Sequence, residues 1–356
     1  MQYSRPAQTF FAQTLLDWHR NDNQRQLPWK QNATPYSIWL SEIILQQTRV
    51  AQGTPYYERF IEAYPNIIAL AHASDNEVFR LWQGLGYYNR CRNLLHTARY
   101  IVDNLKGVFP TRYDDILSLK GVGAYTAAAI ASFAYDQPYA VVDGNVLRLL
   151  ARYFGITTPI DSAEGKKQMA QLAQELLSKE EPATYNQAIM DFGATVCTPV
   201  QPQCNECPFA TQCKAFKNDT VSLLPIKSKK TLNKTRHFNY IIWDSQSKIW
   251  LQKREQKDIW RGLYEPFLIE TPKPVTMKKL AALLQQRGMV IDQLNEAGAS
   301  TQKLSHQTIK AQFYTVEVDD LFIDSSQDGI WVAYKDVKKY AFPKTIVSFF
   351  KKNNYF

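Results

Sequence analysis

Four of the five cysteines in this 356-residue chain lie within one stretch of seventeen residues, spaced Cys197-x6-Cys204-x2-Cys207-x5-Cys213. Four thiolates this close together can hold an iron–sulfur cluster or a tetrahedral zinc ion, and either group constrains the fold of the surrounding loop. Structural zinc sites more often use two CxxC pairs, and only Cys204 and Cys207 form such a pair here. The spacing alone therefore favours a cluster over zinc by a small margin.

A disulfide framework is a third interpretation of the cysteines, and it fits the chain less well. Small disulfide scaffolds are short and secreted, whereas this chain is long and residues 1–10 hold no apolar signal-peptide segment. The longest small and apolar stretch, Ala124–Tyr135, is far shorter than the roughly 20 residues that span a bilayer. We therefore expect reduced thiols, a cytoplasmic and nucleoid-associated protein with no membrane partner, and a Cys91 that packs as a small apolar residue.

The overall composition indicates a globular protein with a basic surface. Hydrophobic residues make up 45% of the chain, which is long enough to bury the cores of two or three domains. Lys and Arg together number 42 against 33 Asp and Glu, so the formal net charge is +9. This surplus is compatible with binding nucleic-acid phosphates but does not establish it, because many soluble proteins are mildly basic.

The hydrophobic pattern changes once along the chain, and the change predicts the domain organisation. From Phe10 to about Phe216, apolar residues recur at three- and four-residue steps, which predicts an all-α domain over residues 1–220. The clearest helical segments are Ile38–Leu45, Val78–Leu85, Ala124–Ala134, Val146–Phe154 and Met169–Leu177. A polar, basic stretch then predicts a linker at 221–236.

From His237 onward, short runs of β-branched and aromatic residues alternate with polar turns. These runs predict strands over 237–244, 248–255, 312–318 and 329–336. Residues 277–288 form one clear helical pattern, closed by Gly288. We expect an α+β module over residues 237–356.

The sequence Leu119-Lys-Gly-Val-Gly-Ala-Tyr-Thr-Ala127 predicts a phosphate-binding turn. Gly121 and Gly123 allow positive φ and close backbone approach around Val122, and a small-residue helix follows with its free N–H groups facing the turn. This is the helix–hairpin–helix pattern that grips a DNA backbone without reading its sequence. An ordinary connection between two helices is the alternative.

Two acidic residues stand in positions where a carboxylate can do chemistry. Asp143 precedes the helix at 146–154, where it can cap the helix, and Asn145 can hydrogen-bond it or a phosphate. Glu42 lies in an otherwise apolar helix, where burial would raise its pKa; a lone glutamate is more often exposed. Gln46, Gln47 and Thr48 follow at the helix end, with side chains suited to base edges.

Taken together, these motifs resemble the adenine DNA glycosylase family of MutY type, within the helix–hairpin–helix superfamily that includes endonuclease III. The resemblance covers about residues 5–225. It is carried by PWK at 28–30, WLSEIILQQT at 39–48, GLGYYNR at 84–90, LKGVGAYTA at 119–127, VVDGNV at 141–146, NQAIMDFGATVC at 186–197 and the four-cysteine run. It implies an all-α glycosylase domain with a [4Fe-4S] loop at 197–213, ligated by Cys197, Cys204, Cys207 and Cys213, so that the cluster is expected rather than zinc.

The resemblance also implies catalytic roles. Glu42 matches the acid that protonates adenine, and Asp143 matches the carboxylate that stabilises the cationic sugar, an arrangement with the logic of sugar hydrolases. Tyr125 stands where lyase-competent relatives carry a nucleophilic lysine, so strand nicking is not expected. Asn145 is expected beside Asp143 in the same site.

Further positions match the family's binding residues. Trp29, Lys30 and Gln187 fall where relatives build the adenine pocket, although relatives differ at the last two. The duplex is expected to be wedged open around the base opposite the flipped adenine. The matching wedge residues are Gln47, Thr48, Leu85 and Tyr87.

The C-terminal module resembles the NUDIX-like domain of this family, best matched by DIWRGLYEPF at 258–267. No run of metal-binding glutamates follows Gly262, so nucleotide hydrolysis is not expected. Ser305 and His306 match the loop that senses 8-oxoguanine, and Leu304 replaces an aromatic residue there.

The sequence therefore predicts a monomeric, monofunctional glycosylase that acts on double-stranded DNA with A·8-oxoguanine or A·G mispairs. Two alternatives stay open. A cluster-containing protein that marks lesions without cutting would need the same cysteines and hairpin. A bifunctional pyrimidine glycosylase/lyase would need an amine, for which Lys120 beside the hairpin is poorly placed.

Overall fold

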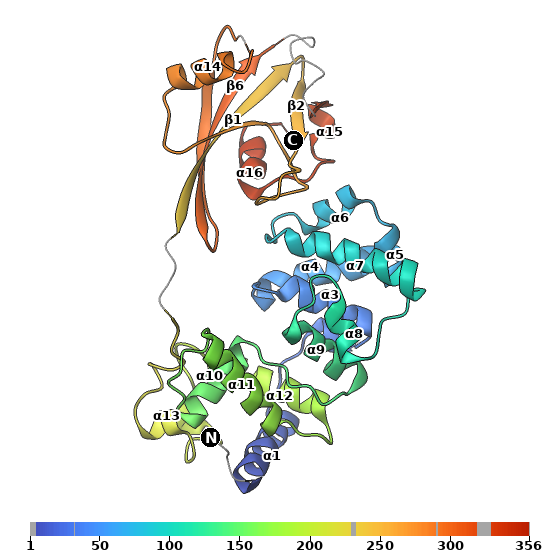
Figure 1. The fold of residues 1–356 in the computed structure, drawn as a ribbon, viewed down its shortest axis with the longest axis vertical. Helices are drawn as coiled ribbons and strands as arrows, with labels where there is room; N and C mark the ends of the chain where they lie inside the picture. The colour runs from blue at the N-terminus through green and yellow to red at the C-terminus, as the bar shows by residue number, and fades with distance from the viewer. Residues whose placement is uncertain (1–4, 32, 229–232, 290, 319–328, 356) are drawn as a thin grey trace. The chain divides into compact units, whose positions relative to one another are not determined.

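The computed structural model describes residues 5–31, 33–228, 233–289, 291–318 and 329–355 (Figure 1). The chain divides into two compact units, Met1–His72 with Asn93–Lys229, and Ala73–Arg92 with Lys230–Phe356. Residues 229–232 of the predicted linker lie outside the described residues. Within the described residues, no helix is both long and apolar enough to cross a membrane.

The first unit is helical throughout, as the sequence predicts, and residues 204–206 add a single 3₁₀ turn. Its helices are α1 (Arg5–Asn21), α2 (Pro28–Gln31), α3 (Pro35–Leu45), α4 (Val50–Ala63), α5 (Ile67–His72), α7 (Asn89–Leu105), α8 (Tyr113–Ser118), α9 (Ala124–Tyr135), α10 (Gly144–Phe154), α11 (Ala163–Leu176), α12 (Pro182–Thr195) and α13 (Lys214–Lys217). The first residues of α7, up to Arg92, belong to the second unit. Cys91 is fully buried near the start of α7, which confirms its predicted packing role.

Helix α3 is buried on nearly all sides, because its sequence is apolar around the whole circumference. Thr34 starts the helix with a reciprocal capping box to Ser37, and Pro35 occupies a first-turn position. The side chains from Tyr36 to Ile44 are all buried, and they pack mainly against α9 and α4. A helix of this kind carries its one acidic residue, Glu42, into the core.

A second core joins α1, α10, α11 and α12 to the cysteine loop. Phe209, between two of the cysteines, is 1% exposed, and its ring centroid lies 4.9 Å from that of Phe11 on α1. It also contacts Tyr153 edge-on at 5.2 Å. Aromatic packing therefore anchors the loop to the helices that carry part of the site.

The turn between α8 and α9 confirms one of the two predicted glycine roles. Gly121 has φ +83°, and a Cβ there would lie 2.7 Å from Asn93, so only glycine fits. Gly123 instead has φ −101° as the N-cap of α9, and a Cβ there would meet nothing within 4 Å. The expectation of a positive φ at Gly123 was wrong, because the turn reverses at Gly121 alone.

In the part of the second unit that the structure describes, the strands form a seven-stranded sheet of order β3-β2-β1-β6-β5, in which β4 also pairs with β1 and β7 with β2. Strand β1 is parallel to β6, and the other pairs are antiparallel. The strands are β1 (Lys234–Ser245), β2 (Lys248–Lys253), β3 (Tyr264–Glu265), β4 (Phe267–Thr271), β5 (Asn295–Lys303), β6 (Gln307–Glu317) and β7 (Gly329–Ala333).

The α+β prediction is confirmed, and the structure adds elements that the sequence pattern does not show. The expected helix is α14 (Met277–Gln285), and α15 (Tyr334–Val337) and α16 (Lys344–Lys352) join it. Strands β3, β4 and β5 were also not predicted, since β3 is two residues long and β5 reads NEAGASTQK with little apolar character.

Helix α6 (Asp75–Trp82) and the turn after it belong to the second unit. Asn76 Nδ2 donates to Lys339 O at 2.7 Å, and Gln83 Oε1 accepts from Phe342 N at 3.1 Å. The helix ends at Trp82 rather than at Leu85 as predicted, because Gly84 and Gly86 both adopt positive φ.

Candidate active site

One large cavity in the first unit gathers most of the predicted catalytic and pocket residues. Its volume is about 1030 Å³. The predicted residues among its lining are Trp29, Lys30, Glu42, Gln47, Thr48, Tyr125, Asp143, Asn145 and Gln187. They come from α2, α3, the start of α9, the start of α10, and α12, so helix packing brings distant sequence motifs to one place.

Glu42 is 7% exposed and lines this cavity. The pKa of its carboxyl is raised to about 7; burial is the main cause, the hydrogen bond with Tyr125 opposes the shift, and the nearby Asp143 adds to it. A substantial share of Glu42 therefore holds its proton at neutral pH. The exposed alternative for this residue is wrong.

Tyr125 lies in the first turn of α9, beside Glu42. Burial and the two neighbouring carboxyls raise the pKa of its phenol well above the ordinary range. The phenol therefore stays neutral and can donate its proton in a hydrogen bond to Glu42. It supplies no amine at this position.

Asp143 caps α10, as its sequence position predicts. Its Oδ1 accepts from the backbone N–H groups of Asn145 at 2.8 Å and Val146 at 2.7 Å, and its Oδ2 accepts from Asn145 Nδ2 at 2.6 Å. Burial raises the pKa of this carboxyl, whereas the three N–H donors favour its ionised form. The carboxylate is thereby held in one orientation at the cavity wall.

A row of hydrogen bonds continues from Asp143 toward the cysteine loop. Arg148 Nη2 donates to Asn145 Oδ1 at 2.9 Å, and Arg148 Nε donates to Cys197 O at 2.7 Å. One turn further along α10, Arg152 Nη1 donates to Thr198 O at 2.7 Å. Helix α10 therefore connects the carboxylate at its N-terminus to the start of the cysteine loop.

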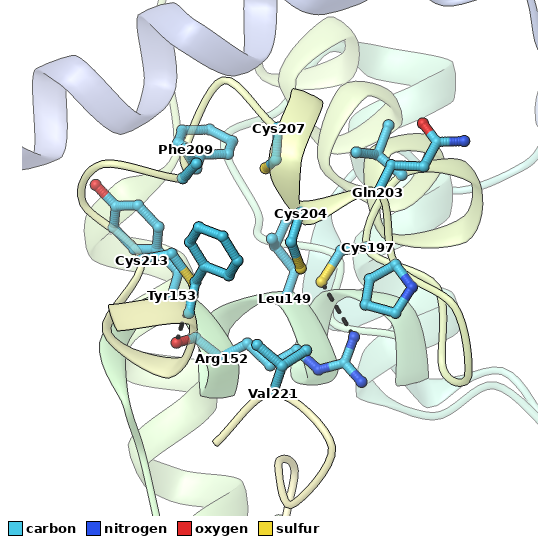
Figure 2. Close-up of a pocket in the computed structure, with 14 residues that line it drawn as sticks. Leu149, Arg152, Tyr153, Cys197, Gln203, Cys204, Cys207, Phe209, Cys213 and Val221 are labelled. Atoms are coloured by element: carbon cyan, nitrogen blue, oxygen red, sulfur yellow. Dashed lines mark hydrogen bonds between the residues drawn. The ribbon is translucent and has the colours of Figure 1, made fainter. Parts of the chain in front are cut away.

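The four predicted ligand cysteines surround one small pocket, shown in Figure 2. Arg152 Nη1 lies 3.5 Å from the Sγ of Cys197, and the Sγ of Cys213 lies 3.6 Å from Arg152 O. All four cysteines are free thiols, which excludes the disulfide alternative in this structure. Within the described residues, no three His, Cys, Asp or Glu side chains are arranged closely enough to form a metal ligand set.

The chemistry of this pocket nevertheless suits a thiolate-bound group. Its lining has no carboxylate or imidazole among the described residues, and its walls are mostly apolar, including Leu149, Val196 and Phe209. Soft thiolate donors in apolar surroundings suit an iron–sulfur cluster or zinc rather than a hard cation. The residues present therefore fit the predicted cluster.

The cavity also contains two basic residues that the sequence reading missed, His19 at the end of α1 and Arg25 in the α1–α2 connection. Burial lowers the pKa of His19 despite the nearby carboxylate of Asp191. No local motif marks either residue. Asp191, which pairs with Arg25 and lies near His19, is far away in the sequence, and only the fold reveals it.

The hairpin residues Gly121, Val122 and Gly123 lie outside the cavity lining, but the hairpin is tied to α3. Gln46 Nε2 donates to Thr126 Oγ1 at 3.2 Å and approaches Gly121 O at 3.5 Å. The side chain of Gln46, which we expected to contact bases, is therefore hydrogen-bonded to the hairpin and the start of α9. Gln47 is exposed with φ +55°, so it is the residue that the helix end presents outward.

The other predicted DNA-contact residues belong to the second unit. Tyr87 is 41% exposed at φ +49°, whereas Leu85 is only 4% exposed. Their turn is held by Gly86 O, which accepts from Trp82 Nε1 at 2.9 Å and Arg90 Nη2 at 3.3 Å. Tyr87 is thus the accessible member of the pair, and the wedge role of Leu85 stays a prediction.

Ser305 and His306 are exposed at the tip of the β5–β6 hairpin. Leu304 N donates to Gln307 O at 2.8 Å, which closes the turn, and Ser305 Oγ lies 3.1 Å from His306 Nδ1. Both polar side chains are available for an external ligand.

Comparison with known proteins gives the family. The HhH-GPD superfamily of base excision DNA repair proteins matches residues 40–179, and a NUDIX domain matches residues 239–352. The chain is 32% identical over 339 residues to adenine DNA glycosylase of Buchnera aphidicola subsp. Schizaphis graminum, covering 94% of this chain and 96% of that protein. This chain belongs to the adenine DNA glycosylase family. The enzyme is therefore a base excision repair hydrolase that acts on N-glycosyl bonds.

Other relatives agree with this assignment. Adenine DNA glycosylase of Mus musculus is 43% identical over 218 residues, covering 59% of this chain and 42% of that protein. A solved thermostable thymine-DNA glycosylase superposes with a TM-score of 0.55 at 28% identity, covering 60% of this chain and 98% of that one. An endonuclease III–DNA complex, at 20% identity and a TM-score of 0.52, shares the fold.

The raised pKa of Glu42 predicts a pH-dependent penalty on stability. Its folded pKa of about 7 exceeds the ordinary value of 4.5, so the folded state loses stability relative to the unfolded state as pH rises through this window. Glu42→Gln should therefore raise the free energy of unfolding at pH 8 by up to roughly 3 kcal/mol, with much less gain at pH 4. Chemical denaturation at both pH values measures this. Equal changes at both pH values, as expected for the exposed Glu58→Gln control, would contradict it.

Proposed function

We propose that this glycosylase removes adenine mispaired with 8-oxoguanine or guanine by hydrolysing the N-glycosidic bond, and leaves the DNA strand unbroken. The observation that carries the proposal is a buried Glu42, partly protonated at neutral pH, in the same cavity as the Asp143 carboxylate. Breaking a glycosidic bond needs an acid for the leaving group and a stabiliser for the cationic sugar. The two carboxyls meet these two needs because their surroundings differ.

Glu42 acts as the acid. Its proton passes to N7 of the extruded adenine, so that the base leaves without a full negative charge. Tyr125 donates its phenolic proton toward the Glu42 carboxyl and supports its orientation. Once Glu42 is ionised, it can accept a proton from the attacking water, which completes the hydrolysis.

Asp143 stabilises the oxocarbenium-like sugar that the departing adenine leaves behind. The orientation of this carboxylate is fixed by hydrogen bonds from the Asn145 side chain and from two backbone N–H groups of α10. Asn145 is itself oriented by Arg148. The negative charge therefore needs little rearrangement when the cation forms.

The base pocket is supplied by Trp29, Lys30 and Gln187. Trp29 is buried and packs edge-on against Tyr57 at 5.4 Å, which fixes one wall. Gln187 offers an amide with both a donor and an acceptor for the Watson–Crick edge of adenine. A cavity of about 1030 Å³ has room for a nucleotide extruded from the duplex.

The hairpin at 121–123 binds the DNA backbone, since Gly123 leaves the N-terminus of α9 open to a phosphate. Gln47, Thr48, Leu85 and Tyr87 act at the duplex around the opposite base. The partner is double-stranded DNA bound by a monomer in the cytoplasm. Strand nicking is not part of the reaction, because the phenol of Tyr125 cannot form a Schiff base.

Cys197, Cys204, Cys207 and Cys213 hold a [4Fe-4S] cluster, as supported by their shared pocket and its thiol donor set. The four thiolates would be cross-linked by a bound cluster, and this would order the loop. The chain's own arginines then tie this loop to α10, through Arg148 at Cys197 O and Arg152 at Thr198 O.

The central test is adenine release from an A·8-oxoguanine duplex under single-turnover conditions. The wild-type rate should fall as pH rises through about 7, because Glu42 loses its proton in that range. Glu42→Gln should abolish release while duplex binding persists. Full activity in this variant would end the assignment, and a borohydride-trapped adduct would support the bifunctional lyase instead.

The lesion loop is tested by comparing two mispairs. Ser305→Ala should lower the rate with A·8-oxoguanine by roughly three- to tenfold, the loss expected for one hydrogen bond, and leave the rate with A·G nearly unchanged. Thr301→Ala, an exposed change on the same hairpin, is the matched control. Equal losses on both mispairs would mean that the loop does not sense the lesion.

The cluster is tested with the fifth cysteine as control. Cys204→Ser should remove the visible thiolate-to-iron absorbance and lower both folded yield and DNA affinity. Cys91→Ser, a change at a buried thiol outside the loop, should keep the absorbance even where it lowers stability. If the wild-type protein contains zinc and no iron, the zinc alternative is correct.

A further inference from the structure

Asp191 on α12 is a fully buried carboxylate with three donors. Its side chain is 0% exposed. Arg25 Nη1 donates to it at 2.7 Å, Lys30 Nζ at 2.6 Å and Asn23 Nδ2 at 2.9 Å. Burying a carboxylate is unfavourable unless it is paired and hydrogen-bonded, and this one is satisfied by two cations and an amide.

All three donors come from the short α1–α2 connection and the start of α2. Within this segment, Arg25 N donates to Asn23 Oδ1 at 3.0 Å, and Lys30 Nζ also donates to Arg25 O at 3.3 Å. Asn23 Nδ2 lies 2.9 Å from His19 Nδ1 on α1. Asp191 therefore fastens an otherwise irregular segment to α12.

The same segment forms part of the cavity wall. His19, Arg25 and Lys30 line the cavity that contains Glu42 and Asp143, whereas Asp191 is not among the lining residues. Two cations drawn to one carboxylate would repel each other in its absence. Asp191 thus offsets their repulsion while both cations remain at the surface of the cavity.

Helix α12 presents a second pocket residue on the same side as Asp191. Gln187 precedes Asp191 by four residues, which places the two side chains one helical turn apart. Gln187 lines the cavity directly, and Asp191 reaches it through Arg25 and Lys30. Helix α12 therefore contributes the amide of Gln187 to this wall directly, and it holds the two cations of the wall through Asp191.

We propose that Asp191 is a positioning residue of the base pocket, which holds Arg25 and Lys30 as a fixed pair of N–H donors toward the extruded base. The inference rests on the proposed function. Guanidinium and ammonium groups only donate hydrogen bonds, so such a wall favours the ring-nitrogen acceptors of adenine. A purine that carries C–H in place of the N1 acceptor, such as 1-deazaadenine, offers these donors one acceptor fewer, so the fixed donors disfavour it.

The first experiment is Asp191→Asn, which removes the charge and keeps the shape. In the full-length protein, the single-turnover rate of adenine release from A·8-oxoguanine duplex should fall by about tenfold or more. The duplex Kd should stay within about twofold, because most DNA contacts lie outside the pocket. The wild-type preference for adenine over 1-deazaadenine in the same duplex should narrow. An unchanged rate and preference in the folded variant would overturn the proposal.

The second experiment separates positioning from a general effect on the fold. In a background carrying Arg25→Gln and Lys30→Met, Asp191→Asn should cause little further loss of rate, since the groups through which it acts are gone. Fully additive losses would show that Asp191 does not act through these two residues and would contradict the proposal. Asp191→Glu, which keeps the carboxylate, should recover much of the rate.

Glu181→Gln is the matched control, because it breaks a partly exposed ion pair between Arg20 of α1 and the N-cap residue of α12. Its rate and base preference should equal those of the wild type. If Asp191→Asn does not fold, Asn23→Ala replaces it; this variant removes one donor and should lower the rate a few-fold at unchanged Kd, and no change would overturn the proposal. Failure of the wild type to release adenine would instead refute the proposed function.

Discussion

The enclosure of helix α3 by other helices is the constraint on which the candidate site of the helical unit depends. Helix α3 is apolar around its whole circumference, so it is stable only when it is surrounded by other helices. That enclosure removes water from Glu42 and raises its pKa to about 7. An ordinary glutamate therefore becomes an acid with a proton to give at neutral pH, and it does so through the packing of α3 against α4 and α9 rather than through any residue of unusual chemistry.

The second carboxylate shares the cavity but has different partners. Asp143 receives three N–H donors because it caps α10, and these donors favour the ionised state that burial opposes. The two carboxyls of one cavity thus differ in their surroundings, since Glu42 has a phenol as neighbour and Asp143 has a helix N-terminus. The position of Asp143 depends in turn on α10, which Arg148 and Arg152 link to the cysteine loop. Aromatic packing of Phe209 against α1 and α10 holds that loop from the other side.

Features governed by local sequence were predictable, and features governed by distant contacts were not. The all-α and α+β textures, the N-cap at Asp143 and the burial of Cys91 follow from periodicity and residue chemistry. The end of α6 at Trp82 did not, because apolar spacing continues to Leu85 while the glycines turn the chain away. Strand β5 was missed because its pairing with β6 stabilises a sequence with little strand character of its own.

The candidate site also contains both residues that the local sequence predicts and residues whose roles depend on distant contacts. The family motifs predicted the catalytic and base-pocket residues of its cavity, and one motif contains Asp191, yet no role was predicted for Arg25 or Asp191, because each acquires its role only from the other. Arg25 and Asp191 are 166 residues apart, and the ion pair between them exists only when α12 packs beside the α1–α2 connection. A carboxylate within an apolar helix pattern is predicted to be exposed at the surface unless its partners are known. The polar wall of the cavity is therefore a property of the tertiary fold, and its electrostatics depend on charges that do not themselves touch the cavity.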